Sequence, residues 1–214
     1  MLSGLKKDFT VSSVDAIGTD PRYPPTEGWP HLVDQLLNFL EENFPSDPVY
    51  GVGHSLGGYL NYLAAVRRPE LFRAIVLLDA PIIGPVRGSM LGATKRLGIV
   101  DRVTPAGGTR DRRSTWRTRE EAKAHFRTRK LFRNFTARCL DDYVSHGLVE
   151  NHELRLKIDP AIEYQIYRTI PHDMMRHLRK LRVPAAFIGG ADPDEAARSI
   201  ARALDALSAA PRAS

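Results

Sequence analysis

The chain is organised around one stretch, Val49-Tyr50-Gly51-Val52-Gly53-His54-Ser55-Leu56-Gly57-Gly58. The residues before Gly53 favour a β-strand, and apolar residues recur at helical spacing after the serine. Glycines two residues either side of Ser55 are expected where a side chain would collide with the neighbouring strand or helix. The stretch therefore predicts a strand, a strained turn that exposes the Ser55 hydroxyl, and a helix.

This Gly-x-Ser-x-Gly pattern is typical of a nucleophile elbow, which aims a serine hydroxyl at a substrate. The same five-residue pattern also arises by chance. A strand before it and an amphipathic helix after it make chance a poor explanation, because they are the structural context that an elbow requires.

Composition indicates an ordinary soluble globular protein. The 214 residues can form one domain with an inserted subdomain, and they are 43% apolar and 26% charged. Cys139 is the single cysteine, so no intramolecular disulfide is possible. Charged residues occupy the N-terminal segment where a secretory signal needs its apolar centre, and the most apolar stretch, residues 74–83, is too short to span a bilayer. We expect a cytoplasmic protein with no membrane partner.

The net charge of +6 is concentrated in the middle of the chain. Residues 84–182 hold 22 Lys and Arg against 11 Asp and Glu, whereas the remainder of the chain is acidic. A solvated helical surface explains such an excess best. The alternatives are attraction of an anionic substrate or of an acidic surface.

The order of elements predicts an α/β fold. Residues 9–16 and 183–188 favour strands, and residues 73–81 form a continuous apolar run of the kind that is buried on both faces of a parallel sheet. Pro30 opens a predicted amphipathic helix. Strands and helices that alternate in this way predict a mostly parallel sheet with flanking helices.

Residues 84–182 predict an inserted helical cap. Thr118 and Glu121 have the spacing of a capping box, Gly147 is placed to end a helix, and Asp159-Pro160 to start another. We therefore expect a core formed by residues 1–83 and 183–214, interrupted by the cap.

Three segments carry a resemblance to a known family. They are Gly53 to Gly58, Leu77 to Pro81 and Val183 to Gly190, and their intervals resemble those of the α/β-hydrolase superfamily, specifically its single-domain, cap-bearing bacterial members. The resemblance covers about residues 2–207. It implies an α/β-hydrolase fold and a serine-dependent hydrolase.

The resemblance also implies roles for particular residues. Ser55 matches the nucleophile, and the backbone N–H of Leu56 would be one donor of the oxyanion hole. The acid that orients a histidine usually follows the strand matched by residues 183–188, so Asp192 is the first candidate and Asp194 the second, while Asp192 before Pro193 also fits a helix N-cap. Asp79 is expected to be structural, although some relatives place the acid after the corresponding strand.

The histidine base is the missing part of this pattern. The family order is serine, acid, histidine, and no histidine follows His177. A serine hydroxyl without a base is a poor nucleophile. His54 is adjacent to the serine on a sharp turn, and His31 and His125 fall in predicted helices. The remaining histidines lie in the cap or its exit, from which one could reach down over Ser55.

The N-terminal part of the pattern is short as well. Nothing before Phe9 matches the family's strand and loop that supply the second oxyanion donor, and the lack of that strand predicts a gap in the sheet or an unpaired edge. Both differences fit an internal portion of a longer hydrolase, with incomplete α/β-hydrolase architecture.

These observations leave three hypotheses for function. The first is a serine hydrolase that acts on a small-molecule carboxylic ester or thioester, with impaired or no activity in a truncated form. The second is a catalytically inactive relic. The third, less favoured, is a polyanion-binding protein, because the Arg-rich run at residues 110–119 matches no nucleic-acid module. We expect no cofactor, since the histidines lack zinc-site spacing and Gly51-x-Gly53 lacks the rest of a dinucleotide motif.

Overall fold

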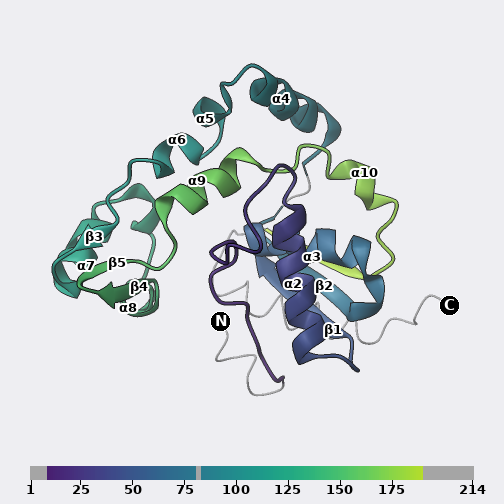
Figure 1. Ribbon diagram of the computed structural model, residues 1–214, viewed down its shortest axis with the longest axis horizontal. Helices are drawn as coiled ribbons and strands as arrows, with labels where there is room; N and C mark the ends of the chain where they lie inside the picture. Colours follow the sequence, from purple (N-terminus) through teal and green to yellow (C-terminus); the bar gives the residue numbers. More distant parts are fainter. Residues whose placement is uncertain (1–8, 81–82, 190–214) are drawn as a thin grey trace.

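The structure, a computed structural model, describes residues 9–80 and 83–189. Figure 1 shows a parallel sheet with helices at one end of the molecule and a second group of short elements at the other. Labels follow that figure. The first part contains α2 (Pro30–Asn43), β1 (Val49–His54), α3 (Leu56–Arg67), η1 (Pro69–Leu71), β2 (Phe72–Leu78), α10 (Met175–Leu178) and β6 (Ala185–Ile188).

The sheet has the order β1-β2-β6, and both pairs of strands are parallel. Helix α3 packs on β1 and β2, and α2 packs on α3. All residues from Ala74 to Leu78 are buried, as a continuous apolar run in a parallel strand predicts. Alternate side chains of β2 point to opposite faces, so Ile75 and Leu77 join the main core with α2 and α3, whereas Val76 and Leu78 lie in a smaller cluster on the other face.

The predicted strand at residues 9–16 is wrong. Residues 10–14 have no regular secondary structure and only run past β1. A β-strand needs hydrogen-bonding neighbours, which the local sequence pattern does not reveal.

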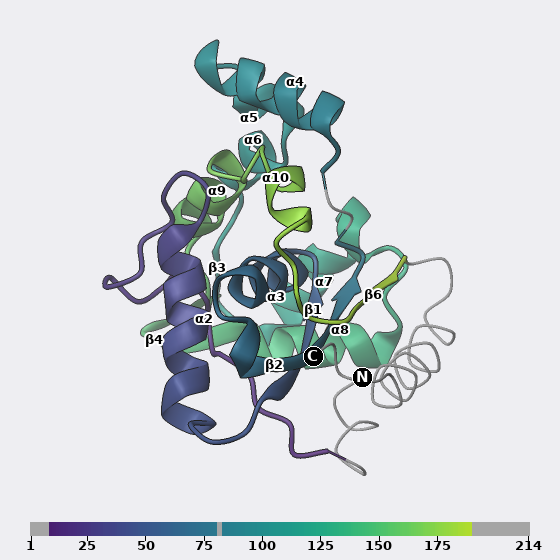
Figure 2. The ribbon, with the colours of Figure 1, turned by 90° about the vertical axis from the view of Figure 1, so that its right-hand side faces the viewer.

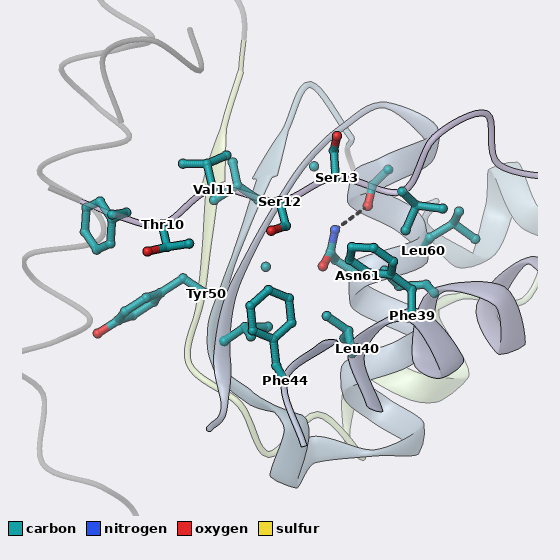
Figure 3. A pocket seen from close by; sticks show the side chains of 18 of the residues that line it. Thr10, Val11, Ser12, Ser13, Phe39, Leu40, Phe44, Tyr50, Leu60 and Asn61 are labelled. Carbon is teal, nitrogen blue, oxygen red and sulfur yellow. Dashed lines mark hydrogen bonds between the residues drawn. The ribbon is translucent and has the colours of Figure 1, made fainter. Parts of the chain in front are cut away.

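Among the described residues, β1 pairs only with β2. The Ser55 N–H donates to the Leu78 carbonyl (2.9 Å), and backbone groups alternate in direction, so those of Val52 and His54 point to the opposite edge of β1. A cavity of about 510 Å³ lies between this edge and residues 9–14, lined by Leu40, Phe44 and other apolar residues (Figure 3). Among the described residues, no strand pairs with this edge of β1, as the lack of the family's preceding strand predicted.

The middle of the chain is less helical than predicted. It contains a three-stranded antiparallel sheet of order β3-β5-β4, which the sequence analysis missed. Its strands have two to four residues, too few for a period-two pattern to be recognised. The elements here are α4 (Pro85–Arg96), α5 (Val100–Val103), α6 (Ala106–Thr109), β3 (Thr115–Trp116), α7 (Arg119–Arg127), η2 (Lys130–Phe132), α8 (Ala137–His146), β4 (Leu148–Asn151), β5 (Glu153–Leu156) and α9 (Pro160–Arg168).

The predicted helix ends in this region are confirmed. The Thr118 side chain accepts a hydrogen bond from the Glu121 N–H (3.1 Å), Gly147 follows the last residue of α8, and the Asp159 side chain caps α9. These signals are read correctly because they depend on residues within one turn.

Besides that smaller cluster, two larger hydrophobic cores lie in the described part of the chain. The main core joins α2, α3 and β2, and it includes Ile166 of α9. The second core is formed by residues of β3, α7, α8, β4 and β5 around Phe126. Helix α9 is held to the main core by Trp29, whose indole N–H donates to the Ile166 carbonyl (3.0 Å). The chain within residues 84–182 therefore contributes to both cores.

Candidate functional site

Ser55 lies in a strained turn at the carboxyl end of β1. Its backbone has φ 49° and ψ −116°, a conformation that non-glycine residues rarely adopt, and α3 begins at the next residue. The side chain is exposed. The predicted strand, turn and helix are confirmed, and strain of this kind is kept where the surrounding structure enforces it.

The glycines around the turn do not all have the predicted role. A Cβ atom on Gly53 would lie 2.2 Å from the Gly57 backbone, so a side chain there is excluded. A Cβ atom on Gly57 would meet nothing within 4 Å, whereas one on Gly58 would lie 2.6 Å from the Cβ atom of Ala80. The prediction is therefore correct for Gly53 and wrong for Gly57. The second close contact is made one residue later, where α3 crosses the chain that follows β2.

Asp79 lies beside the serine turn. It follows β2, the strand that pairs with β1, and it is exposed with a φ of 46°. Tyr59 is one helical turn beyond Ser55, and burial together with the negative charge of Asp79 raises the pKa of its hydroxyl. The structure thus brings the Ser55 hydroxyl, the Asp79 carboxylate and the Tyr59 phenol to the carboxyl ends of β1 and β2.

Tyr59 was not proposed from the sequence. Its position four residues after Ser55, on the first turn of a helix that starts at the elbow, could have indicated that it lies near the serine turn. The closeness of Asp79 could likewise have been inferred, because the carboxyl ends of neighbouring parallel strands meet at the same sheet edge.

The backbone N–H of Leu56, the predicted oxyanion donor, lies at the start of α3 next to the Ser55 turn. Leu56 is the first residue of α3, and the first N–H groups of a helix have no partner within the helix. The hydrogen bonds among the described residues give this N–H no acceptor. It is therefore available to an oxygen atom with partial negative charge, which the helix dipole favours.

Asp192 and Asp194, the two predicted acid candidates, lie outside the described residues. No hydrogen bond or ion pair within residues 9–80 and 83–189 joins a histidine to Ser55 or Asp79. His54 is exposed next to the serine. His31 is 3.6 Å from Asp34.

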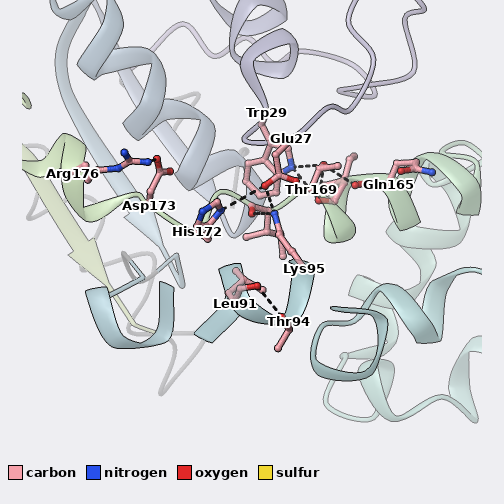
Figure 4. Close-up of polar contacts among 12 residues, drawn as sticks. Glu27, Trp29, Leu91, Thr94, Lys95, Gln165, Thr169, His172, Asp173 and Arg176 are labelled. Atoms are coloured by element: carbon pink, nitrogen blue, oxygen red, sulfur yellow. Dashed lines mark hydrogen bonds and ion pairs between the residues drawn. The ribbon is translucent and has the colours of Figure 1, made fainter. Parts of the chain in front are cut away.

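His172 belongs to a separate polar cluster, shown in Figure 4. Its Nδ1 atom is 3.6 Å from Glu27 Oε1, and the same oxygen atom accepts from Lys95 Nζ (2.5 Å). Lys95 also donates to the Ile170 carbonyl. The cluster joins α4 to the loops before α2 and after α9.

The cavity beside β1 does not include the serine turn itself. Gly53, His54 and Gly57 line it, but Ser55 and Asp79 do not. It adjoins the elbow from the side of β1 that faces residues 9–14. We therefore assign the candidate site to the Ser55 turn rather than to this cavity.

Most arginines of the basic run at residues 110–119 have structural partners. Arg112 pairs with Glu163 (2.5 Å), Arg113 pairs with Glu121, and the Arg119 guanidinium donates to the Val144 carbonyl (2.8 Å). Arg110 lies over the ring of Tyr164. These arginines therefore contribute to contacts within the middle region.

The described part of the chain contains no group of three or more His, Cys, Asp or Glu side chains that could hold a metal ion. Within the same ranges, every helix is too short or too polar to cross a membrane.

Comparison with known proteins identifies the family. The model of the Alpha/beta hydrolase family matches residues 1–214. This chain belongs to that family. The α/β fold with a parallel sheet and flanking helices agrees with this assignment.

Relatives with a curated description match only part of this family member. The abhydrolase domain-containing protein AFT2-1 of Alternaria alternata is 35% identical over 101 residues, which are 47% of this chain and 34% of that protein. Monoglyceride lipase of Rattus norvegicus is 39% identical over 49 residues, 23% of this chain and 16% of that protein. The matches thus span about a third of those proteins or less.

Solved structures support the fold. The crystal structure of E-2-(acetamidomethylene)succinate hydrolase matches with a TM-score of 0.69 and 18% identity, over 95% of this chain and 84% of that one. The thioesterase domain from the curacin biosynthetic pathway matches with a TM-score of 0.56 and 15% identity, over 94% and 69%.

Proposed function

We propose that this α/β hydrolase uses Ser55 as the nucleophile that cleaves a small-molecule carboxylic ester or thioester. The observation that carries the proposal is the strained, exposed Ser55 between β1 and α3. A sharp strand-to-helix turn of this kind presents the hydroxyl at the sheet edge, where the acyl carbon of a substrate can approach it.

In the proposed reaction, Ser55 Oγ forms a bond to the acyl carbon while its proton passes to a base. The carbonyl oxygen atom gains negative charge, which the Leu56 N–H at the start of α3 would stabilise. The base gives this proton to the departing alcohol or thiol as its bond to the acyl carbon breaks, which leaves an acyl-enzyme. Water then adds to the acyl carbon, and breakage of the bond to Ser55 Oγ releases the acid and restores the hydroxyl. No metal ion or cofactor is required by this sequence of steps.

Asp192 remains the proposed acid, with Asp194 as its alternative. Among the described residues, Asp79 directly follows β2, the strand that pairs with β1, and this position beside the elbow makes it the competing candidate. The name of one relative, monoglyceride lipase, favours an oxygen ester as the substrate.

The opposing proposal is a catalytically inactive hydrolase fold. It is supported by the lack of any described contact between a histidine and Ser55 or Asp79. Polyanion binding is less favoured, because several cations of the middle region are already paired with carboxylates.

We expect Ser55→Ala to lower the hydrolysis of a short-chain aryl ester by at least about a thousandfold, because the nucleophile is removed. Ser145→Ala is the matched control, since Ser145 is also exposed and lies on α8. A fluorophosphonate probe, which reacts with activated serines, should label the wild type and the Ser145 variant but not the Ser55 variant.

Equal hydrolysis by wild type and Ser55→Ala would exclude Ser55 catalysis. A folded wild type that neither hydrolyses the ester nor reacts with the probe would instead support the inactive alternative. Asp192→Asn, Asp194→Asn and Asp79→Asn, assayed side by side, decide the acid: the substitution that lowers kcat without unfolding the chain marks it.

A further inference from the structure

Helix α4 packs its small residues against the rest of the chain and exposes its apolar face, the reverse of an ordinary surface helix. The face that it presents to the rest of the chain carries Gly88, Gly92 and Lys95. A Cβ atom on Gly88 would lie 2.1 Å from the His172 carbonyl oxygen atom, and one on Gly92 would lie 3.0 Å from the His172 ring, so the helix backbone packs closely there. Lys95, on the same face, donates hydrogen bonds to Glu27 and to the Ile170 carbonyl (Figure 4).

The opposite face of α4 is apolar and exposed. Val86, Met90 and Leu97 are 73%, 64% and 72% exposed, the last directly after the helix, and Val103 on α5 is 59% exposed. At 3.6 residues per turn, positions 86, 90 and 97 lie within about 40° of one another, so they form one stripe. Figure 2 shows α4 at the top of the molecule, away from the sheet. An amphipathic helix that was held only by its host domain would place such residues inward.

The charge beside this stripe is positive. Arg87 and Arg96 lie on α4, Arg102 lies on α5, and the sequence of α4 contains no Asp or Glu. The acid of α5, Asp101, is 3.7 Å from Arg168 and accepts from the Tyr164 hydroxyl (2.8 Å). The one lysine of α4 is already paired with Glu27. Exposed apolar side chains with flanking arginines are the pattern of a helix that lies in the plane of a lipid interface and contacts anionic headgroups.

We propose that α4, with the adjoining α5, docks on the surface of a lipid assembly with anionic headgroups. Val86, Met90, Leu97 and Val103 enter the acyl boundary, and the arginines contact the headgroups. A second copy of the chain fits this surface less well. The 12 residues of α4 measure about 18 Å, a stable dimer interface takes roughly 20–30 residues a side, and two arginine-flanked stripes would repel each other.

The test is sedimentation with vesicles of phosphatidylcholine alone or with 30% phosphatidylglycerol. We expect the wild type to bind the anionic vesicles, and salt to weaken that binding. Leu97→Asp should lower the partition by at least about tenfold, because it places a charge in the apolar boundary. Leu131→Asp is the matched control, since Leu131 is 74% exposed on η2, within the second part of the molecule. Circular dichroism checks that both variants stay folded.

Binding that follows Leu97 and not Leu131 supports the proposal, whatever the esterase activity, and Ser55→Ala should bind vesicles like the wild type. The proposal is overturned by a wild type that stays in the supernatant with both vesicle types, or by equal effects of the two substitutions. Light scattering provides the last arm: a dimer in solution that Leu97→Asp dissociates would assign the stripe to a second copy.

Discussion

At the scale of single residues, the elbow is defined by two glycines that differ sharply in their surroundings. Gly58 has the Ala80 Cβ atom and the Gly53 carbonyl in the space that a side chain would need, whereas Gly57 faces open space. Gly58→Ala should therefore lower the free energy of unfolding by about 1–3 kcal/mol through overpacking. Gly57→Ala should leave it unchanged or raise it by up to about 1 kcal/mol, because alanine favours the helix.

Urea unfolding of the two variants beside the wild type measures this difference. Equal destabilisation by both substitutions would contradict the contacts described for the turn. The pair also serves as a control for Ser55, since Gly57→Ala changes the same turn without touching the hydroxyl.

The residues of the elbow show what the sequence reveals and what it does not. The turn at Ser55 and the close contact at Gly53 were predicted correctly because they depend on a strand, a turn and a helix that are contiguous in the chain. The role of Gly58 depends on Ala80, which follows another strand, so the five-residue pattern assigned it to Gly57 instead. The influence of the Asp79 charge on the pKa of Tyr59 is of the same long-range kind.

At the scale of elements, helix α7 carries a group that should make its stability depend on pH. The His125 ring lies against Trp116 and Phe126 (centroids 5.5 and 5.6 Å apart), and its Nε2 atom accepts from Arg129. Burial, with the charges of Arg129 and Arg113, lowers the pKa of His125, although Glu121 opposes this.

A histidine with a lowered pKa binds protons more weakly in the folded state than in the unfolded one. Its contribution to stability is present above the ordinary pKa of about 6.5 and is lost as the pH falls through the folded value. We therefore expect the wild type to lose stability relative to His125→Phe between pH 7.5 and 5.5. Chemical unfolding of both proteins across this range tests the prediction, and parallel pH profiles would contradict it.

Prediction of elements succeeded where local signals were strong. The apolar run of β2, the proline at the start of α2 and the caps of α7 and α9 each specify an element from neighbouring residues. Residues 9–16 carry a strand-like pattern but pair with no strand among the described residues, and β3, β4 and β5 are strands that exist mainly because they pair with one another. In both cases the deciding partner is distant in sequence.

At the scale of the whole molecule, the two hydrophobic cores have no buried residue in common. The sheet with α2 and α3 forms one, and Figure 1 shows α7, α8 and β3 to β5 gathered at the opposite end of the molecule. Helix α9 is bound to the first core through Trp29 and Ile166. We therefore expect the two parts of the chain to unfold independently, with the boundary between them at the segment from β5 to α9. The sequence pattern instead placed the end of the cap at residue 182.

Phe126→Ala tests this division. Phe126 is buried at the centre of the second core, in contact with the rings of Trp116, Phe132 and Tyr143. Its removal should cost that core about 3–5 kcal/mol, because the surrounding rings cannot fill the space. Since the first core loses no contact, amide hydrogen exchange should accelerate across residues 115–156 while α2, α3 and β2 stay protected.

Phe135→Ala is the control within the same region, because Phe135 is 41% exposed and should change exchange little. Exchange that accelerates equally in β2 and in β5 would show that the two cores unfold as one cooperative unit. Protection retained in β2 but lost in α9 would shift the boundary to the Trp29 contact. The predicted result requires α9 to stay protected, because its buried Ile166 and its hydrogen bond to Trp29 both belong to the sheet-bearing core.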